Sequence, residues 1–108
     1  MVLSRDFRQT VQARAARDRG FREALFEEAV QTLLIGDLDA GRAAMRDYIN
    51  ATIGFEKLSA ALRRPQKSLM RMFGPSGNPT AENLLGVIGV LQEKTGVHLK
   101  VRAVTQPA

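Results

Sequence analysis

The stretch from Phe55 to Pro79 constrains the fold most, because it carries two short apolar patterns on either side of a turn. Apolar side chains recur at helical spacing from Phe55 to Leu62 and again from Leu69 to Phe73. Two helices that short do not stand alone, and a turn of about three to four residues between steeply crossing helices makes a helix-turn-helix. Pro65 suits the start of the second helix, because proline has no N–H to lose there. We therefore predict an all-α domain built around this motif, with its second helix beginning at Pro65.

The polar side chains of the second helix predict what it contacts. If its apolar residues turn inward, a set of hydrogen-bonding side chains faces outward or lies at the edge: Gln66, Lys67, Ser68 and Arg71. Arginine and lysine pair with guanine, glutamine pairs with adenine, and serine contacts several base edges or a phosphate. Such residues near the start of a second helix are what groove reading requires. A helical hairpin with a solvated polar face is the alternative interpretation.

The distribution of charge favours a phosphate-backbone partner. The net charge is +5, from 16 Lys and Arg against 11 Asp and Glu. Residues 1–53 hold eight basic and eight acidic side chains, so the excess lies entirely in residues 54–108, with eight basic and three acidic. A basic excess on one motif is typical of nucleic-acid binding. A membrane surface also attracts such charge, but the outward face of 65–73 lacks the apolar stripe that a membrane-lying helix inserts.

Length and composition bound the remaining possibilities. The 108 residues suit one domain, with N-terminal helices in 1–53 and the motif, a core helix and a terminal strand in 54–102. There is no cysteine, no signal-peptide pattern and no apolar run of about 18 residues, so we expect a cytoplasmic protein without a membrane segment. No catalytic constellation, metal-ligand spacing or dinucleotide motif is present. We expect neither an enzyme nor a cofactor.

Local signals place the other elements and give five or six helices in all. Asp6 is expected to cap a helix that reaches about Asp18, and Gly20 to separate it from a core helix over 21–34, whose wide apolar stripe includes Leu34. Asp37 is expected to cap a helix that reaches residue 53, with its Leu38 facing inward. Thr80 is expected to cap a helix that ends at Gly96. The alternation in 97–102 predicts a strand, which would pair either with residues 1–4 or with a second subunit.

Two segments carry a resemblance to a known family. The run from Asp47 to Leu58, Asp-Tyr-Ile-Asn-Ala-Thr-Ile-Gly-Phe-Glu-Lys-Leu, is followed by Lys67 to Thr80, Lys-Ser-Leu-Met-Arg-Met-Phe-Gly-Pro-Ser-Gly-Asn-Pro-Thr. Together they resemble the small addiction-module antidote proteins with a λ-repressor-like helix-turn-helix. The resemblance implies a DNA-binding antitoxin or transcriptional regulator that is usually dimeric and represses its own operon. It also implies a small RelE-like ribonuclease toxin as a further partner.

The resemblance assigns roles to particular positions. Its base-reading positions fall on Gln66, Lys67 and Ser68, with Arg71 one turn further. Phosphate contacts are expected from four polar residues on and around the motif: Lys57, Arg64, Ser76 and Asn78. The chain departs from the usual pattern, because Ser59 and Arg63 stand where many such motifs have alanine and glycine, and Arg64 replaces a small apolar residue. If the turn requires a positive φ, the Cβ of Arg63 makes that conformation sterically unfavourable.

Two functional hypotheses follow. The first is a sequence-specific operator-binding repressor, favoured by the motif, the one-sided charge and the resemblance. The second is an interaction module in which the helices of 7–53, neutral overall and broadly apolar, hold a toxin while DNA binding is residual. Non-specific RNA binding ranks third, because nearly all aromatic residues are assigned to the core and leave no stacking platform.

Overall fold

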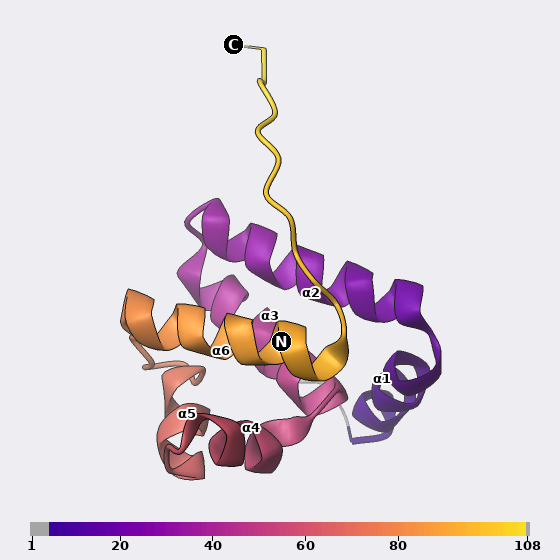
Figure 1. The fold of residues 1–108 in the computed structure, drawn as a ribbon, viewed down its shortest axis with the longest axis vertical. Coiled ribbons are helices and arrows are strands. Elements are labelled where there is room, and N and C mark those ends of the chain that lie inside the picture. The colour runs from indigo at the N-terminus through magenta and orange to yellow at the C-terminus, as the bar shows by residue number, and fades with distance from the viewer. Residues whose placement is uncertain (1–4, 108) are drawn as a thin grey trace.

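The computed structural model describes residues 5–107, which form six α-helices followed by an extended tail (Figure 1). The helices are α1 (Arg5–Arg17), α2 (Arg19–Leu34), α3 (Leu38–Ala51), α4 (Gly54–Leu62), α5 (Gln66–Met72) and α6 (Ala81–Thr95). Residues 5–107 contain no β-strand. The prediction of an all-α chain is therefore confirmed. The prediction of a C-terminal strand is wrong.

Three helix boundaries follow the capping signals of the sequence. The Asp37 side chain accepts a hydrogen bond from the Ala40 N–H at 3.2 Å, which caps α3. Thr80 caps α6 in the same way, accepting from the Asn83 N–H at 3.1 Å. The helix ends at Gly96, whose φ of 77° is a left-handed conformation that glycine adopts without a Cβ clash. These predictions are confirmed.

Three other boundaries were misplaced by the sequence. The break before α2 lies at Asp18, which caps that helix by accepting from the Phe21 N–H at 3.1 Å. Gly20 therefore lies inside the first turn, because a strong side-chain cap two residues earlier already starts the helix. Asp6 lies in the first turn of α1 rather than ahead of it. Pro65 is extended, with a ψ of 136°, so that α5 begins one residue later at Gln66.

The core is organised around α3, which packs against α1, α2 and α4, while α6 packs against α4. Phe26 of α2 stacks on Tyr48 of α3 with ring centroids 4.5 Å apart. The Tyr48 hydroxyl lies 3.1 Å from the Thr95 hydroxyl, which joins α3 to the end of α6. The remaining large buried side chains come from α3 to α6 and from Phe73, which directly follows α5: Met45, Ile49, Leu58, Leu69, Leu91, Val87 and Phe73.

The segment after α6 follows the predicted alternation only at its start. Val97 is buried, His98 is exposed and Leu99 is half-buried. The Leu99 N–H donates to the Gln92 side chain at 2.9 Å, so its hydrogen bond goes to α6 instead of a strand. Beyond that point the chain leaves the helices, and Val101 is 95% exposed (Figure 1). Residues 5–107 contain no strand with which this segment could pair. The expected partner at residues 1–4 lies outside the described part.

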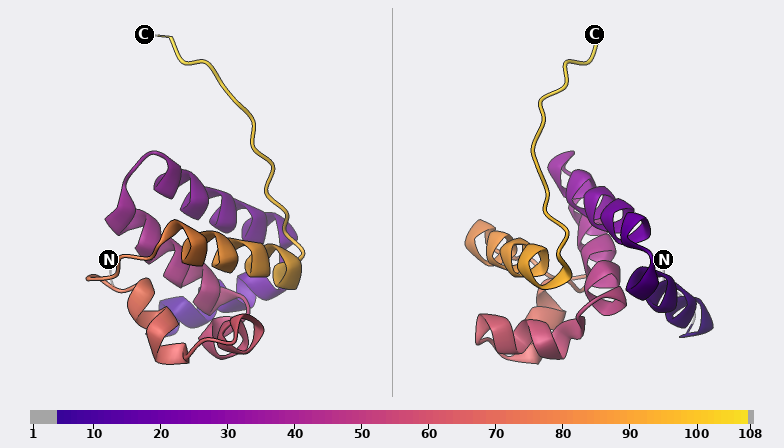
Figure 2. Two further views of the ribbon diagram at one scale, coloured as in Figure 1. Left: turned by 60° about the vertical axis from the view of Figure 1, so that its left-hand side comes forward. Right: turned by 45° about the vertical axis from the view of Figure 1, so that its right-hand side comes forward.

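The turn between α2 and α3 exposes an apolar cluster, consisting of Leu34, Ile35 and Leu38, at 75, 76 and 54% exposure. The apolar pattern predicted that Leu34 and Leu38 face the core. They do not, because they lie at the outer ends of their helices, beyond the crossing where Leu33 packs on the core. The tail leaves the body on the side away from α4 and α5, which lie together (Figure 2).

Candidate nucleic-acid interface

The connection between α4 and α5 is three residues long and is fixed by its own hydrogen bonds. Arg63 adopts a left-handed conformation, with φ of 55° and ψ of 45°. Its N–H donates to the Ser59 carbonyl, and the Arg64 N–H donates to the same oxygen at 3.2 Å. The Ser59 hydroxyl donates to the Arg64 carbonyl. Ser59 therefore closes the turn from both sides, and the steric cost anticipated at Arg63 is present.

The inner face of α5 holds this short helix in place. The Pro65 carbonyl accepts from the Ser68 and Leu69 N–H groups at 3.1 and 3.2 Å, which starts the helix without a side-chain cap. Leu69 is fully buried, and Phe73 lies with its ring centroid 6.4 Å from that of Phe55 on α4. A seven-residue helix is marginal by itself, so these tertiary contacts supply its stability.

The opposite face of α5 presents the predicted base-reading residues. Gln66, Lys67, Ser68 and Arg71 are all exposed. None of their side chains forms a hydrogen bond or an ion pair within residues 5–107. At a rise of about 1.5 Å per residue, the four positions span roughly 8 Å of helix. The structure thus places them on one short helix with their donors and acceptors unused.

The four predicted phosphate-contacting residues are exposed but are spread over three segments. Lys57 lies on α4, Arg64 lies in the turn, and Ser76 and Asn78 lie in the loop after α5. They do not gather into one cluster. Lys57 instead shares the lining of a hollow of about 470 Å³ with Lys94 of α6, a residue that sequence reasoning did not select.

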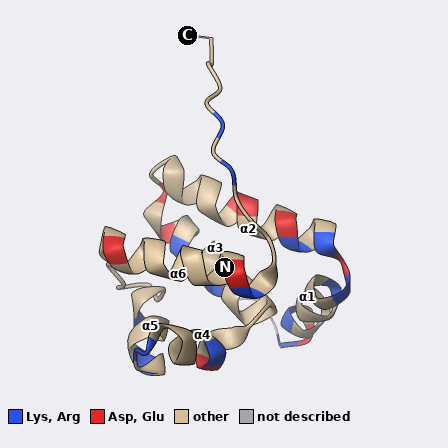
Figure 3. Ribbon diagram, viewed as in Figure 1, with Lys and Arg blue, Asp and Glu red and all other residues tan. Residues whose placement is uncertain are grey.

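Charge is one-sided around α5. Figure 3 shows basic but no acidic residues on this helix. Five basic residues and no acidic one occur between Lys57 and Ala81. The next acid along the chain, Glu82, lines a hollow of about 240 Å³ together with Arg64. Helix α5 therefore carries only basic charges, and the first acidic residue after it lies at the start of α6.

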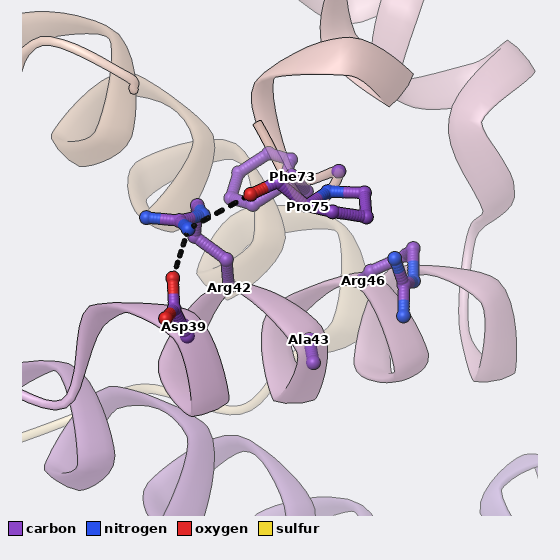
Figure 4. A pocket seen from close by; sticks show the side chains of 7 residues that line it. Asp39, Arg42, Ala43, Arg46, Phe73 and Pro75 are labelled. Atoms are coloured by element: carbon purple, nitrogen blue, oxygen red, sulfur yellow. Dashed lines mark hydrogen bonds and ion pairs between the residues drawn. The ribbon is translucent and has the colours of Figure 1, made fainter. Parts of the chain in front are cut away.

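A second basic site, missed from the sequence, lies between α3 and the residues that follow α5 (Figure 4). Arg42 and Arg46 of α3 line a hollow of about 360 Å³ with Phe73 and Pro75 across from them. The four-residue spacing of the arginines was the only signal in the sequence, because it puts both on one helix face. The loop that completes the hollow is 33 residues further along the chain, and only the fold brings it there.

Comparison with protein-family models, with curated proteins and with solved structures found no match for this chain. Within the described residues, no helix combines the length and the apolar character needed to cross a bilayer.

Proposed function

We propose that this protein is a sequence-specific DNA-binding transcriptional repressor in which α4 and α5 act as a helix-turn-helix. One observation carries the proposal. Helix α5 has its apolar face fixed by Leu69 and Phe73, while every polar side chain of its outer face is exposed and unused. A rigid helix with free donors and no acidic residue suits insertion into the major groove.

In this proposal, the side chains of α5 divide into groups with different roles. Lys67 and Arg71 donate to guanine O6 and N7, Gln66 pairs with adenine, and Ser68 contacts a base edge or a phosphate. Contacts to the sugar-phosphate backbone set the position of the helix but carry no sequence information. These contacts fall to Lys57, Arg64, Ser76 and Asn78, all exposed around α5.

The resemblance to addiction-module antidote proteins supports a more specific role within this class. In that role the protein is an antitoxin that acts as a homodimer and represses its own operon. Two copies of α5 in a dimer would lie about 34–36 Å apart, matching half-sites one turn of DNA apart. A footprint that covers a single half-site would contradict the dimeric arrangement.

Fluorescence-anisotropy titration tests the proposal directly. The full chain is titrated with a duplex from immediately upstream of its own gene and with a shuffled duplex, across a series of salt concentrations. We expect tight binding to the upstream duplex alone at physiological salt, with a salt slope that counts the phosphate contacts. Equal, weak and salt-sensitive binding to both duplexes would reject a sequence-specific repressor.

Substitution of Arg71 separates base reading from general attraction. Arg71→Ala is expected to cost about 1–3 kcal/mol of binding and to relax specificity at one base position. Arg17→Ala is a matched control, because Arg17 is also exposed but lies on α1. If Arg71→Ala leaves operator affinity untouched, Arg71 does not read a base.

One observation favours a second function, that of an interaction module for a small toxin. The apolar cluster of Leu34, Ile35 and Leu38 is exposed at the α2–α3 turn, and clustered apolar exposure marks contact surfaces. Co-expression with the product of the neighbouring gene tests this function. We expect Leu34→Asp with Ile35→Asp to abolish the complex without changing DNA affinity. A complex that survives the double substitution would exclude this surface.

A further inference from the structure

We propose that the hollow formed by Arg42 and Arg46 of α3 and by Phe73 and Pro75 is a phosphate-binding pocket. Figure 4 shows the two arginines on either side of Ala43, with Phe73 and Pro75 opposite the helix. The hollow measures about 360 Å³, which admits a phosphate group with room to spare. It is separate from the outer face of α5, because its lining comes from α3 and from the residues after α5.

Arg42 has hydrogen-bonding capacity that its neighbours do not use. Its side chain is only 11% exposed, and its Nη2 donates to Asp39 Oδ1 at 2.5 Å and to the Pro75 carbonyl at 3.5 Å. Nε is buried without any hydrogen-bond partner within residues 5–107, and no partner is found there for Nη1. Nε has no water-accessible surface, so Nη1 is the unpaired donor that an anion in the hollow can reach. A phosphate oxygen is an acceptor of the required kind.

The charge in the pocket favours an anion. Arg42 and Arg46 are four residues apart on α3, and like charges at that spacing repel each other. Asp39 pairs with Arg42, whereas Arg46 forms no ion pair in the described part of the chain. Arg46 also interacts electrostatically with Asp47, which lies outside the pocket, whereas Asp39 lines the pocket itself. Two arginines against one aspartate leave the lining with a net charge of +1. An anion between the two guanidinium groups would neutralise it and relieve the repulsion.

Phosphate fits the pocket better than a carboxylate does. Two guanidinium groups present more donors than the two oxygens of one carboxylate accept, whereas a phosphate adds further oxygens and charge. Ala43, Phe73 and Pro75 supply apolar walls, which lower the local dielectric and strengthen the contacts. Because Pro75 directly precedes Ser76, a DNA phosphodiester held here would extend the proposed interface from α5 onto α3. A free phosphate group is the other source of the same chemistry.

NMR titration of the full chain with inorganic phosphate, at constant ionic strength set with chloride, tests the pocket without DNA. We expect saturable shifts confined to residues 42–46 and 73–75. Arg46→Gln is expected to weaken phosphate binding about tenfold, because one charged fork is lost. Arg42→Lys, which keeps the charge but loses the planar fork, should weaken it as well. Arg17→Gln on α1 is the control and should bind like the parent protein.

A second experiment measures DNA binding and identifies the source of the phosphate. This experiment rests on the proposed function. The logarithm of DNA affinity falls as the logarithm of the salt concentration rises. If the pocket holds a DNA phosphate, Arg46→Gln makes this fall less steep by about 1, while Arg17→Gln leaves it unchanged. An unchanged slope with phosphate shifts present would assign the pocket to a free phosphate group. Absence of both effects would overturn the proposal. If the protein binds no operator at all, the proposed function fails, and the phosphate titration alone decides the pocket.

Discussion

Arg63→Gly is expected to stabilise the protein, although it removes a side chain and creates no contact. Arg63 is the only non-glycine residue with a positive φ within residues 5–107, at 55°. A Cβ atom in this conformation costs about 1–2 kcal/mol. Glycine removes that cost but makes the unfolded chain more flexible, which costs about 0.4–1 kcal/mol. The side chain is exposed and forms no hydrogen bond there, so little packing is lost.

The two ranges leave a net gain of about 0–1.6 kcal/mol in the free energy of unfolding, with a middle value of about 0.8 kcal/mol. For a domain of this size a gain of about 0.8 kcal/mol raises the melting temperature by roughly 3–6 °C. Urea unfolding followed by circular dichroism measures the free energy, and a thermal scan gives the temperature. Ser59 still closes the turn in the variant, because the hydrogen bonds at Arg63 and Arg64 use backbone N–H groups.

Two controls separate the backbone effect from the loss of charge. Arg63→Ala removes the same charge but keeps a Cβ, so it should remain about 0.8 kcal/mol less stable than Arg63→Gly. Arg64→Gly removes a charge at a neighbour whose φ is not positive, and it should destabilise by about 0.4–1 kcal/mol. Equal stability of Arg63→Ala and Arg63→Gly would refute the reasoning, as would a loss of stability in Arg63→Gly.

Other substitutions and a titration test the core. Gly41 is buried where α3 crosses α2, and a Cβ there would collide with the Leu33 side chain and lie 3.2 Å from its Cα, so Gly41→Ala should cost about 1–3 kcal/mol in urea unfolding. Gly89→Ala in α6 is the counterpart, because a Cβ there has nothing within 4 Å, and it should gain up to about 1 kcal/mol. Burial raises the pKa of Tyr48, the single tyrosine, above 10.0. The folded state then holds this proton more tightly than the unfolded state, so the contribution of Tyr48 to stability is fully present below pH 10.0 and is lost as the pH rises through its folded pKa. Phenolate absorbance should therefore appear together with loss of helical circular dichroism, and ionisation of an intact fold near pH 10.0 would contradict the burial.

Capping signals located some helix boundaries well, because a cap is a contact between residues close in sequence. Asp37 and Thr80 each bond an N–H three residues later, so the sequence contains both partners. The start of α2 was misplaced because two local signals competed. The side chain of Asp18 determined the boundary, and Gly20 was accommodated inside the helix.

Of the two candidate sites, one depends on residues close in sequence and the other on residues far apart. The exposed face of α5 could be predicted, because burial of Leu69 and Phe73 fixes the rotation of a helix and thereby leaves Gln66, Lys67 and Arg71 outside. The pocket on α3 could not be predicted. Arg42 contacts Pro75, which is 33 residues further along the chain, and the fold alone brings the two together. The periodicity of apolar residues in the sequence contains no information about such a contact.

The sequence by itself determined the helical class, the caps at Asp37, Thr80 and Gly96, and the concentration of positive charge around α5. Each of these depends on residues within a few positions of one another. Tertiary structure alone decided that residues 97–102 form no strand, that Leu34 and Leu38 face outward, and that two arginines of α3 meet the loop after α5. The physical reason is that a strand needs an edge, a core has limited room, and a pocket needs walls from distant segments.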